Sequence, residues 1–161
     1  MSDMKKPSPI ILFVCTGNTC RSPMAQALAS AALQENGAAA TVLSAGVAAS
    51  DGYPASHNAI LAMAEVGLDI QSHASTQLSR EMLEDADLVL TMTAGHLQAV
   101  KALCPSANAY TLDEYANPLQ NVSDVSDPFG GNLQIYRACA AQIKELILQS
   151  MARFKEDLWK I

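Results

Sequence analysis

The chain has 161 residues, half of which are hydrophobic, and it carries a formal net charge of −6 at pH 7. This length suits one compact domain whose core needs neither disulfides nor a structural metal. The acidic balance argues against a nucleic-acid-binding surface, so we expect no nucleic-acid partner. An anion-binding site in this protein has to create its positive potential locally.

The start of the chain is a polar extension of nine residues. The apolar run that follows, residues 10–14, is too short for a signal-peptide core or a membrane span, so we expect no membrane association and a cytoplasmic location. In that compartment the cysteines should be free thiols. No Cys-x-x-Cys or His-rich cluster is present, which predicts neither a metal site nor a cofactor. The four cysteines are Cys15, Cys20, Cys104 and Cys139.

The first predicted element is a strand over residues 10–14, a continuous β-branched and aromatic run that is typical of a strand buried on both faces. A polar turn follows, and Ser22 is expected to cap a helix whose first position is Pro23. That helix should end at Asn36 and Gly37, which form a common C-terminal stop.

The rest of the pattern alternates strands with helices. In chain order we predict a strand at 41–45, helices at 56–66 and 77–84, a strand at 87–92, a helix at 95–103 and a strand at 109–112. A loop of roughly twenty residues, 113–132, comes next, and loops of this length are usually functional or disordered. A long terminal helix then has a buried stripe at helical spacing, formed by Leu133, Tyr136, Ala140, Ile143, Ile147, Met151 and Phe154.

Strands that alternate with helices predict an α/β fold with a parallel, doubly wound sheet. We expect a single domain over residues 1–161, with four strands in the order 2-1-3-4 and helices on both faces. Ligands of such sheets bind beyond the carboxyl ends of the strands. The first strand leads directly into Cys15, so the residues that follow it are the expected site.

Residues 15–23, Cys-Thr-Gly-Asn-Thr-Cys-Arg-Ser-Pro, can form a phosphate-binding loop. A Cys followed by an Arg six positions later is weak on its own, but this pair brackets a turn between a buried strand and a helix. Backbone N–H groups of such a turn, together with the helix N-terminus, can form a nest for an anion. The predicted phosphate-binding residues are Thr16, Gly17, Asn18, Thr19, Cys20, Arg21 and Ser22.

The residue types in this loop each have a chemical reason. Arg21 can bind two oxygens of a phosphoryl group, and the positive field of the nest favours a nucleophilic thiolate at Cys15. Gly17 is expected to relieve backbone strain, and Asn18 tolerates a left-handed conformation. The plainer alternatives are a core cysteine at a strand end and a surface arginine in a first helical turn.

Three further residues near the loop have more than one interpretation. Besides capping the helix, Ser22 can donate its hydroxyl hydrogen to a Cys15 thiolate. Cys20 can simply pack, or it can form a reversible disulfide with Cys15, five residues away. Ser44, at the end of the second strand, can brace the loop from beside it.

A hydrolytic mechanism at Cys15 also needs a general acid and base. The candidates are His57, His73, His96, Asp124 and Asp127. Asp127 is favoured because the proline after it stiffens the backbone, Phe129 can line a pocket, and two glycines then permit a sharp turn. Asp124 stays the rival, because Asp-Pro alone often marks only a turn. His73 and His96 are expected to be hydrogen-bonding or surface residues rather than catalysts.

With these motifs the chain resembles the low-molecular-weight protein-tyrosine-phosphatase family from about residue 10 to residue 154. The matching segments are 13–25, Ser44-Ala45-Gly46, 86–90 and Asp127-Pro128-Phe129. The loop and the Asp-Pro pair, in this order and separation, are highly specific. The resemblance implies Cys15 as nucleophile, Arg21 as phosphate clamp, Asp127 as acid and base, Ser22 as thiolate donor and Asn18 as loop brace. We also expect Ser44 and His73 to support the site.

A finer resemblance is to the bacterial protein-arginine-phosphatase branch of this family. Tyrosine-directed members usually carry an aliphatic residue where this chain has Thr19, and they often have Tyr after the Asp-Pro. Here Phe129 and two glycines follow the Asp-Pro, and the loop after Gly46 has no Trp. A phosphoarginine leaving group is planar and polar, so Thr19 offers it a hydroxyl and Asp127 can hydrogen-bond its nitrogens. Thr19 and Phe129 are therefore the expected specificity residues.

The leading hypothesis is a phosphatase that acts on phosphoarginine in phosphorylated proteins through a phosphocysteine intermediate, as a monomer. Its first alternative is a tyrosine phosphatase of the same family. A thioredoxin-coupled arsenate reductase would need Cys104 and Cys139 to relay with Cys15, and neither lies in a mobile loop with a partner. A non-catalytic phosphate-binding module would need neither Cys15 nor Asp127.

Overall fold

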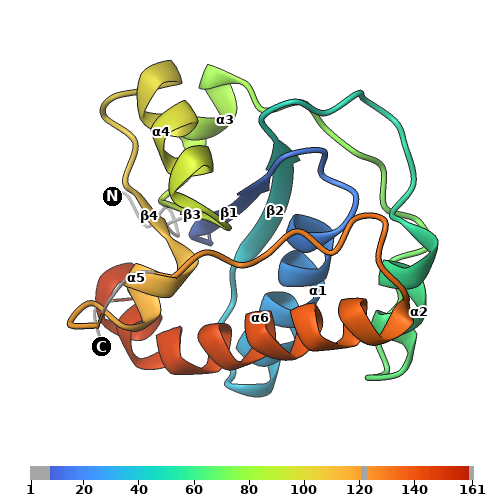
Figure 1. Ribbon diagram of the computed structural model, residues 1–161. Coiled ribbons are helices and arrows are strands. Elements are labelled where there is room, and N and C mark those ends of the chain that lie inside the picture. Colours follow the sequence, from blue (N-terminus) through green and yellow to red (C-terminus); the bar gives the residue numbers. More distant parts are fainter. Residues whose placement is uncertain (1–7, 121–122, 160–161) are drawn as a thin grey trace.

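The structure, a computed structural model, describes residues 8–120 and 123–159 (Figure 1). The strands are β1 (Ile10–Cys15), β2 (Thr41–Gly46), β3 (Leu88–Thr91) and β4 (Ala109–Thr111). The helices are α1 (Arg21–Glu35), α2 (His57–Ala64), α3 (Arg80–Asp85), α4 (Ala94–Leu103), α5 (Leu112–Ala116) and α6 (Leu133–Phe154), which continues into a π-helical segment, η1 (Lys155–Trp159). Residues 1–7 of the predicted polar extension lie outside the described residues.

All four strands form one parallel sheet in the order β2-β1-β3-β4. This arrangement confirms the predicted α/β class and strand order. The central strand β1 pairs with both β2 and β3, and Cys15 at its end lies opposite Gly46. The carboxyl ends of the strands therefore meet at one edge of the sheet, where ligands of such folds bind.

Helices bury both faces of the sheet, as predicted. Ile11 and Phe13 of β1 pack into a core with side chains of α1, α2 and α6, whereas Leu12 and Val14 pack into a second core with α3 and α4. Figure 1 shows the same division, with α1 and α6 on one side of the strands and α3 and α4 on the other. Because alternate side chains of β1 enter opposite cores, its sequence is a continuous hydrophobic run.

One helix was not predicted. α5 occupies the start of segment 113–132, which the sequence pattern predicts as a loop. It forms because Thr111 and Glu114 make a capping box, in which each side chain accepts a hydrogen bond from the other residue's backbone N–H. In the rest of that segment, the described residues before α6 contain no helix or strand.

Two helix starts also differ from the prediction by more than one residue. α3 begins at Arg80 rather than at residue 77, because Ser79 caps it with its side chain. The prediction that Ser22 caps α1 is wrong: Cys20 occupies the cap position without a side-chain hydrogen bond, and Ser22 lies inside the first helical turn. Its hydroxyl is directed to the loop instead.

Candidate active site

A cavity of about 230 Å³ at the carboxyl end of β1 brings most of the predicted site residues together. It lies between the loop after β1 and the segment that precedes α6. In Figure 1 this segment crosses the start of α1, to which the loop leads. The residues that line it are Cys15, Thr16, Gly17, Thr19, Cys20, Arg21, Asp127 and Phe129. Asn18 and Ser22 do not line the cavity; both are fully buried.

The sulfur of Cys15 is held close to a hydroxyl. Cys15 is buried at the end of β1, and its Sγ lies 2.9 Å from Ser22 Oγ. Asn18 donates its Nδ2–H to the same oxygen over 2.7 Å, so Ser22 keeps its own hydrogen for an acceptor. The carbonyl oxygen of Ala45 is 3.5 Å away, which leaves the sulfur as the closer acceptor. The Ser22 hydroxyl is thus placed to donate a hydrogen bond to the sulfur of Cys15.

Asn18 provides the unusual backbone conformation of the loop. Its φ is 58°, the one positive value among the described non-glycine residues. Asn adopts the left-handed region more readily than most residues. The φ of Gly17 lies outside that region, so the expectation that Gly17 relieves the strain of the turn is wrong.

The same asparagine is held from a distant segment of the chain. Its side-chain Oδ1 accepts a hydrogen bond from the backbone N–H of Thr76 over 2.8 Å, and its backbone carbonyl oxygen lies 2.7 Å from His73 Nε2. A carbonyl can only accept, so His73 donates with its Nε2–H. His73, which we expected to support the site, thus contacts the backbone of the phosphate loop.

Ser44 extends this buried polar network to α1. Its Oγ accepts from Asn18 Nδ2 over 3.0 Å and donates to Gln26 Oε1 over 2.6 Å. Gln26 in turn donates to the carbonyl oxygen of Val42 in β2. The sequence gives no sign of the part that Gln26 plays, because a glutamine within a helix is ordinary.

Gly46 allows the loop and the end of β2 to come close together. A Cβ atom on Gly46 would lie 2.4 Å from the carbonyl oxygen of Thr16 and 2.9 Å from the backbone nitrogen of Asn18. The next residue, Val47, donates its N–H to the carbonyl oxygen of Cys15 over 2.9 Å. Any side chain at position 46 would therefore push the phosphate loop away from the sheet.

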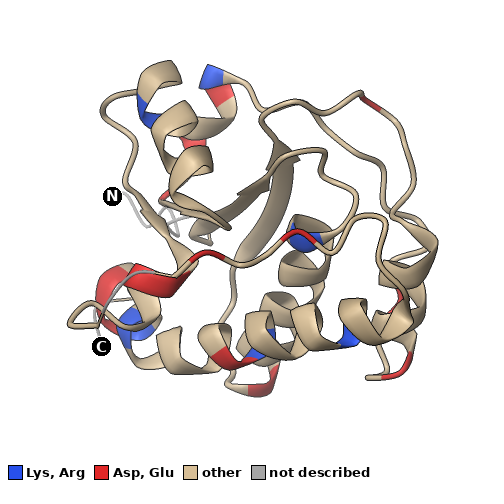
Figure 2. Cartoon of the chain, viewed as in Figure 1, with Lys and Arg blue, Asp and Glu red and all other residues tan. Residues whose placement is uncertain are grey.

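Arg21 is buried beneath the cavity, not on the surface. Its Nη1 donates to the carbonyl oxygen of Val125 over 2.8 Å, which aligns the guanidinium with the segment before α6. Its Nη2 lies 3.6 Å from Asp127 Oδ2 and 3.4 Å from Thr16 Oγ1. Figure 2 shows the resulting charge pair as a basic segment at the start of α1 beside an acidic segment of the neighbouring loop.

The two rival aspartates have different surroundings. Asp127 lines the cavity, its side chain is 51% exposed, and its Oδ1 accepts a hydrogen bond from the N–H of Phe129. Asp124 instead accepts a hydrogen bond from the N–H of Ala94 over 2.9 Å, at the first position of α4. Only Asp127 therefore has a carboxylate oxygen at the cavity and near Arg21.

The remaining candidate acids are histidines. His57 is exposed at the start of α2. His96 is buried in the first turn of α4, where burial and the nearby Arg21 guanidinium lower the pKa of its imidazole to about 4. Its Nε2 is 2.8 Å from Thr16 Oγ1. As expected, both His73 and His96 make hydrogen bonds.

The cysteines other than Cys15 are free, buried thiols. Cys20 Sγ lies 3.0 Å from Ser56 Oγ and 3.2 Å from the hydroxyl of Tyr136. Burial raises the pKa of the Cys139 thiol to about 12, which makes it a poor nucleophile at neutral pH. Cys104 packs in the other core, with α3 and α4. This arrangement offers no relay of reactive thiols for an arsenate reductase; the Cys15–Cys20 disulfide stays a prediction.

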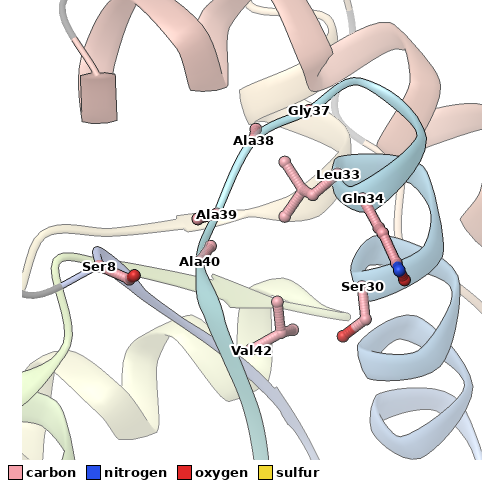
Figure 3. Close-up of a pocket in the computed structure, with 9 residues that line it drawn as sticks. All are labelled: Ser8, Ser30, Leu33, Gln34, Gly37, Ala38, Ala39, Ala40 and Val42. Carbon is pink, nitrogen blue, oxygen red and sulfur yellow. The ribbon is translucent and has the colours of Figure 1, made fainter.

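A larger cavity, of about 480 Å³, lies where α1 ends and β2 begins. Figure 3 shows that mostly glycine, alanine and apolar side chains line it, with Ser30, Gln34 and Ser8 as its polar side chains. It lacks a nucleophile paired with a base or a cation, so we favour the smaller cavity as the site. Within the described residues there is no cluster of potential metal ligands. No described helix has the length and apolar character needed to cross a bilayer.

Known proteins resemble this chain over most of its length. A family model described as low molecular weight phosphotyrosine protein phosphatase matches residues 10–160. The protein-arginine-phosphatase of Bacillus subtilis (strain 168) is 40% identical over 149 residues, which cover 91% of this chain and 97% of that protein.

Two solved structures share the fold. One is the arginine phosphatase YwlE, as a cysteine-to-serine mutant with a phosphorylated active-site serine; its TM-score is 0.88 at 38% identity, and the match covers 94% of this chain and 99% of that one. The other is a low molecular weight protein tyrosine phosphatase from T. tengcongensis, with a TM-score of 0.85 at 37% identity and coverage of 91% and 99%. The chain described here belongs to the low molecular weight phosphotyrosine protein phosphatase family.

Proposed function

We propose that this phosphatase removes phosphoryl groups from arginine side chains of proteins through a phosphocysteine at Cys15. The observation that carries the proposal is the meeting of Cys15, Arg21 and Asp127 in one cavity at the start of α1. A thiolate, a cation and a carboxylate are what phosphoryl transfer to a cysteine requires.

The proposed reaction has two steps. In the first, the Cys15 thiolate attacks phosphorus in line, the bond from phosphorus to the guanidine nitrogen breaks, and the carboxyl of Asp127 gives its proton to that nitrogen. In the second, the Asp127 carboxylate takes a proton from water, which attacks phosphorus and releases inorganic phosphate and the thiolate. Arg21 and the backbone N–H groups of the loop bind the phosphoryl oxygens throughout.

The choice of arginine as substrate is supported by Thr19 and by the relatives. Thr19 lines the cavity, and it brings a hydroxyl where an aliphatic residue would bring only apolar atoms. The B. subtilis relative is named a protein-arginine-phosphatase. A guanidinium is polar around its whole edge, so a rim with hydroxyl and carboxylate groups suits it better than an apolar rim.

A second candidate is a tyrosine phosphatase. It is favoured by Phe129, whose ring is largely exposed and also lines the cavity, where it can stack on a phenol. The T. tengcongensis structure carries that name. The two candidates share the same catalytic groups and differ in the leaving group, which is the guanidine of arginine in one and the phenol of tyrosine in the other.

The first experiment tests the catalytic roles. In Cys15→Ser the weaker nucleophile should lower kcat/KM on a phosphoarginine protein at least about 10⁴-fold, measured as released phosphate. Asp127→Asn removes the proton donor and should lower it by about 10² to 10³-fold. Asp124→Asn is the matched control, since its amide oxygen still accepts from Ala94, and it should stay close to wild type. Full activity in Cys15→Ser would contradict the proposal.

The second experiment tests substrate choice. Thr19→Ile removes the hydroxyl and adds apolar bulk, so the ratio of kcat/KM for phosphoarginine to that for a phosphotyrosine peptide should fall by about tenfold or more. Thr19→Ser, which keeps the hydroxyl, is the control and should retain the wild-type preference. An unchanged ratio in Thr19→Ile would mean that other residues select the substrate.

We also propose that the protein works as a monomer in the cytoplasm. All four cysteines are free thiols, which suits a reducing compartment. A net charge well away from zero favours separate, soluble chains.

A further inference from the structure

The hydroxyl of Thr16 and the imidazole of His96 meet at the edge of the cavity, although 80 positions separate them in the chain. Thr16 follows Cys15 and lines the cavity, whereas His96 belongs to the first turn of α4 and is only 6% exposed. Thr16 Oγ1 is 2.8 Å from His96 Nε2 and 3.4 Å from Arg21 Nη2. One hydroxyl oxygen thus contacts nitrogens from two different helices.

His96 is neutral at physiological pH. Burial and the adjacent Arg21 guanidinium both disfavour the imidazolium and lower the pKa of His96 to about 4, against the opposite effect of the Asp124 and Asp127 carboxylates. One ring nitrogen therefore carries a proton and the other carries a lone pair.

The hydrogen bonds of the ring decide which nitrogen is protonated. Nδ1 of His96 is buried and has no hydrogen-bond partner within the described residues. A buried N–H without an acceptor is less well tolerated than an unpaired lone pair. The proton therefore lies on Nε2, which donates to Thr16 Oγ1. Arg21 has donors only, so it donates to that oxygen as well.

These two donors fix the direction of the Thr16 hydroxyl hydrogen. A hydroxyl oxygen has two acceptor positions, and His96 and Arg21 occupy both. The remaining hydrogen must point away from both nitrogens. We propose that His96 is a positioning residue that holds the Thr16 hydroxyl as a hydrogen-bond donor to a phosphoryl oxygen in the cavity. The inference rests on the proposed function, because a bound phosphoryl group supplies the acceptor.

In this arrangement Thr16 adds a side-chain donor to the backbone N–H groups and Arg21. Donors that are oriented before the reaction stabilise charge on the transferring group without reorganisation. Without His96, the Thr16 hydroxyl can rotate its hydrogen toward the position that Nε2 had occupied, and it then no longer donates to the phosphoryl oxygen. His96 therefore acts only through Thr16. Loss of His96 should have no effect on catalysis once the Thr16 hydroxyl is gone, whereas a general structural effect would persist.

A double-mutant cycle tests the coupling. Thr16→Val and His96→Leu should each lower kcat/KM about tenfold, and the double variant should also lose about tenfold rather than a hundredfold. His96→Gln, whose amide N–H can take the place of Nε2–H, should recover most of the loss when Thr16 is present. His57→Leu makes the same change at an exposed histidine and is the control. Additive losses in the double variant, or full activity in His96→Leu, would overturn the inference.

Two further measurements do not depend on the natural substrate. The dissociation constant of orthovanadate should rise about tenfold in Thr16→Val and in His96→Leu, without further increase in the double variant. Long-range ¹⁵N–¹H spectra of the wild-type protein at pH 7 should show His96 neutral, with its proton on Nε2. A protonated Nδ1 at pH 7 would overturn the inference, whereas failure to hydrolyse phosphoarginine alone would overturn only the proposed function.

Discussion

Asn18 links the thiol, the loop and the sheet through a single buried side chain. It takes the left-handed conformation that turns the loop, and its amide donates to both Ser22 and Ser44. The hydroxyl of Ser22 is thereby left to face Cys15. At the residue scale the geometry of the nucleophile thus depends on polar side chains that never reach the cavity.

Gly46 offers a direct test of how closely the loop must approach the sheet. In Gly46→Ala the new Cβ would lie 2.4 Å from the Thr16 carbonyl oxygen, which is backbone and cannot move without shifting the loop. We expect the free energy of unfolding to fall by about 2 to 3 kcal/mol. A displaced loop should also lower kcat at least about tenfold.

Urea unfolding and steady-state kinetics measure both effects of Gly46→Ala. The matched control is Gly95→Ala in α4, where the nearest atom to a new Cβ is Thr93 Oγ1 at 3.6 Å, an ordinary contact. That variant should be at least as stable as the wild type, because alanine favours helix more than glycine does. Equal stability of the two variants would contradict the close approach at Gly46.

At the scale of elements, α1 and α6 form the layer that supports the site. α1 begins at the phosphate loop and packs against α6, whose apolar stripe faces the core beside β1 (Figure 1). The predicted stripe is confirmed except at its first position: Leu133 is only partly buried, and the other six residues are buried. The position of the loop therefore depends on contacts made far from the cavity.

Two substitutions to alanine in α6, one at a buried and one at an exposed position, test whether the predicted stripe contributes to stability through burial. Ile143 is 0% exposed, so Ile143→Ala leaves a cavity and should lower the free energy of unfolding by about 3 kcal/mol. Leu148 is 47% exposed, and Leu148→Ala should change it by less than about 1 kcal/mol. Chemical denaturation of both variants makes the comparison, and a similar loss in the two would show that the stripe is assigned incorrectly.

At the scale of the whole molecule, the proposed anion site lies in an acidic protein. Figure 2 shows few basic segments and several acidic ones spread over the chain, in keeping with the net charge of −6. In the proposed function, the attraction for phosphate comes from one buried arginine, the loop N–H groups and the N-terminus of α1. Local placement of these groups outweighs the net charge because exposed charges are screened over about 8 to 10 Å.

The buried neutral His96 makes the stability of the whole protein depend on pH. Its pKa is about 4 in the folded state and near 6.5 when unfolded, so the unfolded chain binds a proton first as the pH falls. This contribution to stability is complete above pH 6.5 and is lost progressively between pH 6.5 and 4. Between pH 7 and 4.5 it should amount to roughly 2 kcal/mol.

Comparison with His96→Gln isolates the contribution of His96 from every other effect of acid on the free energy of unfolding. The glutamine variant cannot take up the proton. Urea unfolding at pH 7 and pH 4.5 should therefore show a smaller acid-induced loss in the variant than in the wild type. Equal losses would mean that folding does not lower the pKa of His96.

Much of this architecture can be predicted from the sequence because it is encoded locally. The apolar run of β1, the helix that follows the loop after Cys15 and the strand–helix alternation are patterns among near neighbours, and they predict the parallel sheet and the edge that carries the site. The capping box of Thr111 and Glu114 is equally local and could have predicted α5.

The tertiary structure decided what depends on contacts between distant segments. The local sequence favours Asp127 but leaves Asp124 as a rival; the packing of their loop shows that Asp124 accepts from the first N–H of α4, whereas Asp127 lies at the cavity near Arg21. Ser22 follows the rule for a helix cap, yet burial beside Cys15 and Asn18 gives its hydroxyl other partners.

The site, too, has parts that the local sequence encodes and parts that depend on contacts between distant segments. The cysteine, the arginine and the loop between them are adjacent in the chain, so the sequence by itself was enough to predict a phosphate site with a nucleophilic thiol. The contact of Thr16 with His96, and that of Arg21 with Val125, join residues 80 and 104 positions apart. No local pattern encodes such pairs, because their geometry is set by how helices and loops pack around the sheet.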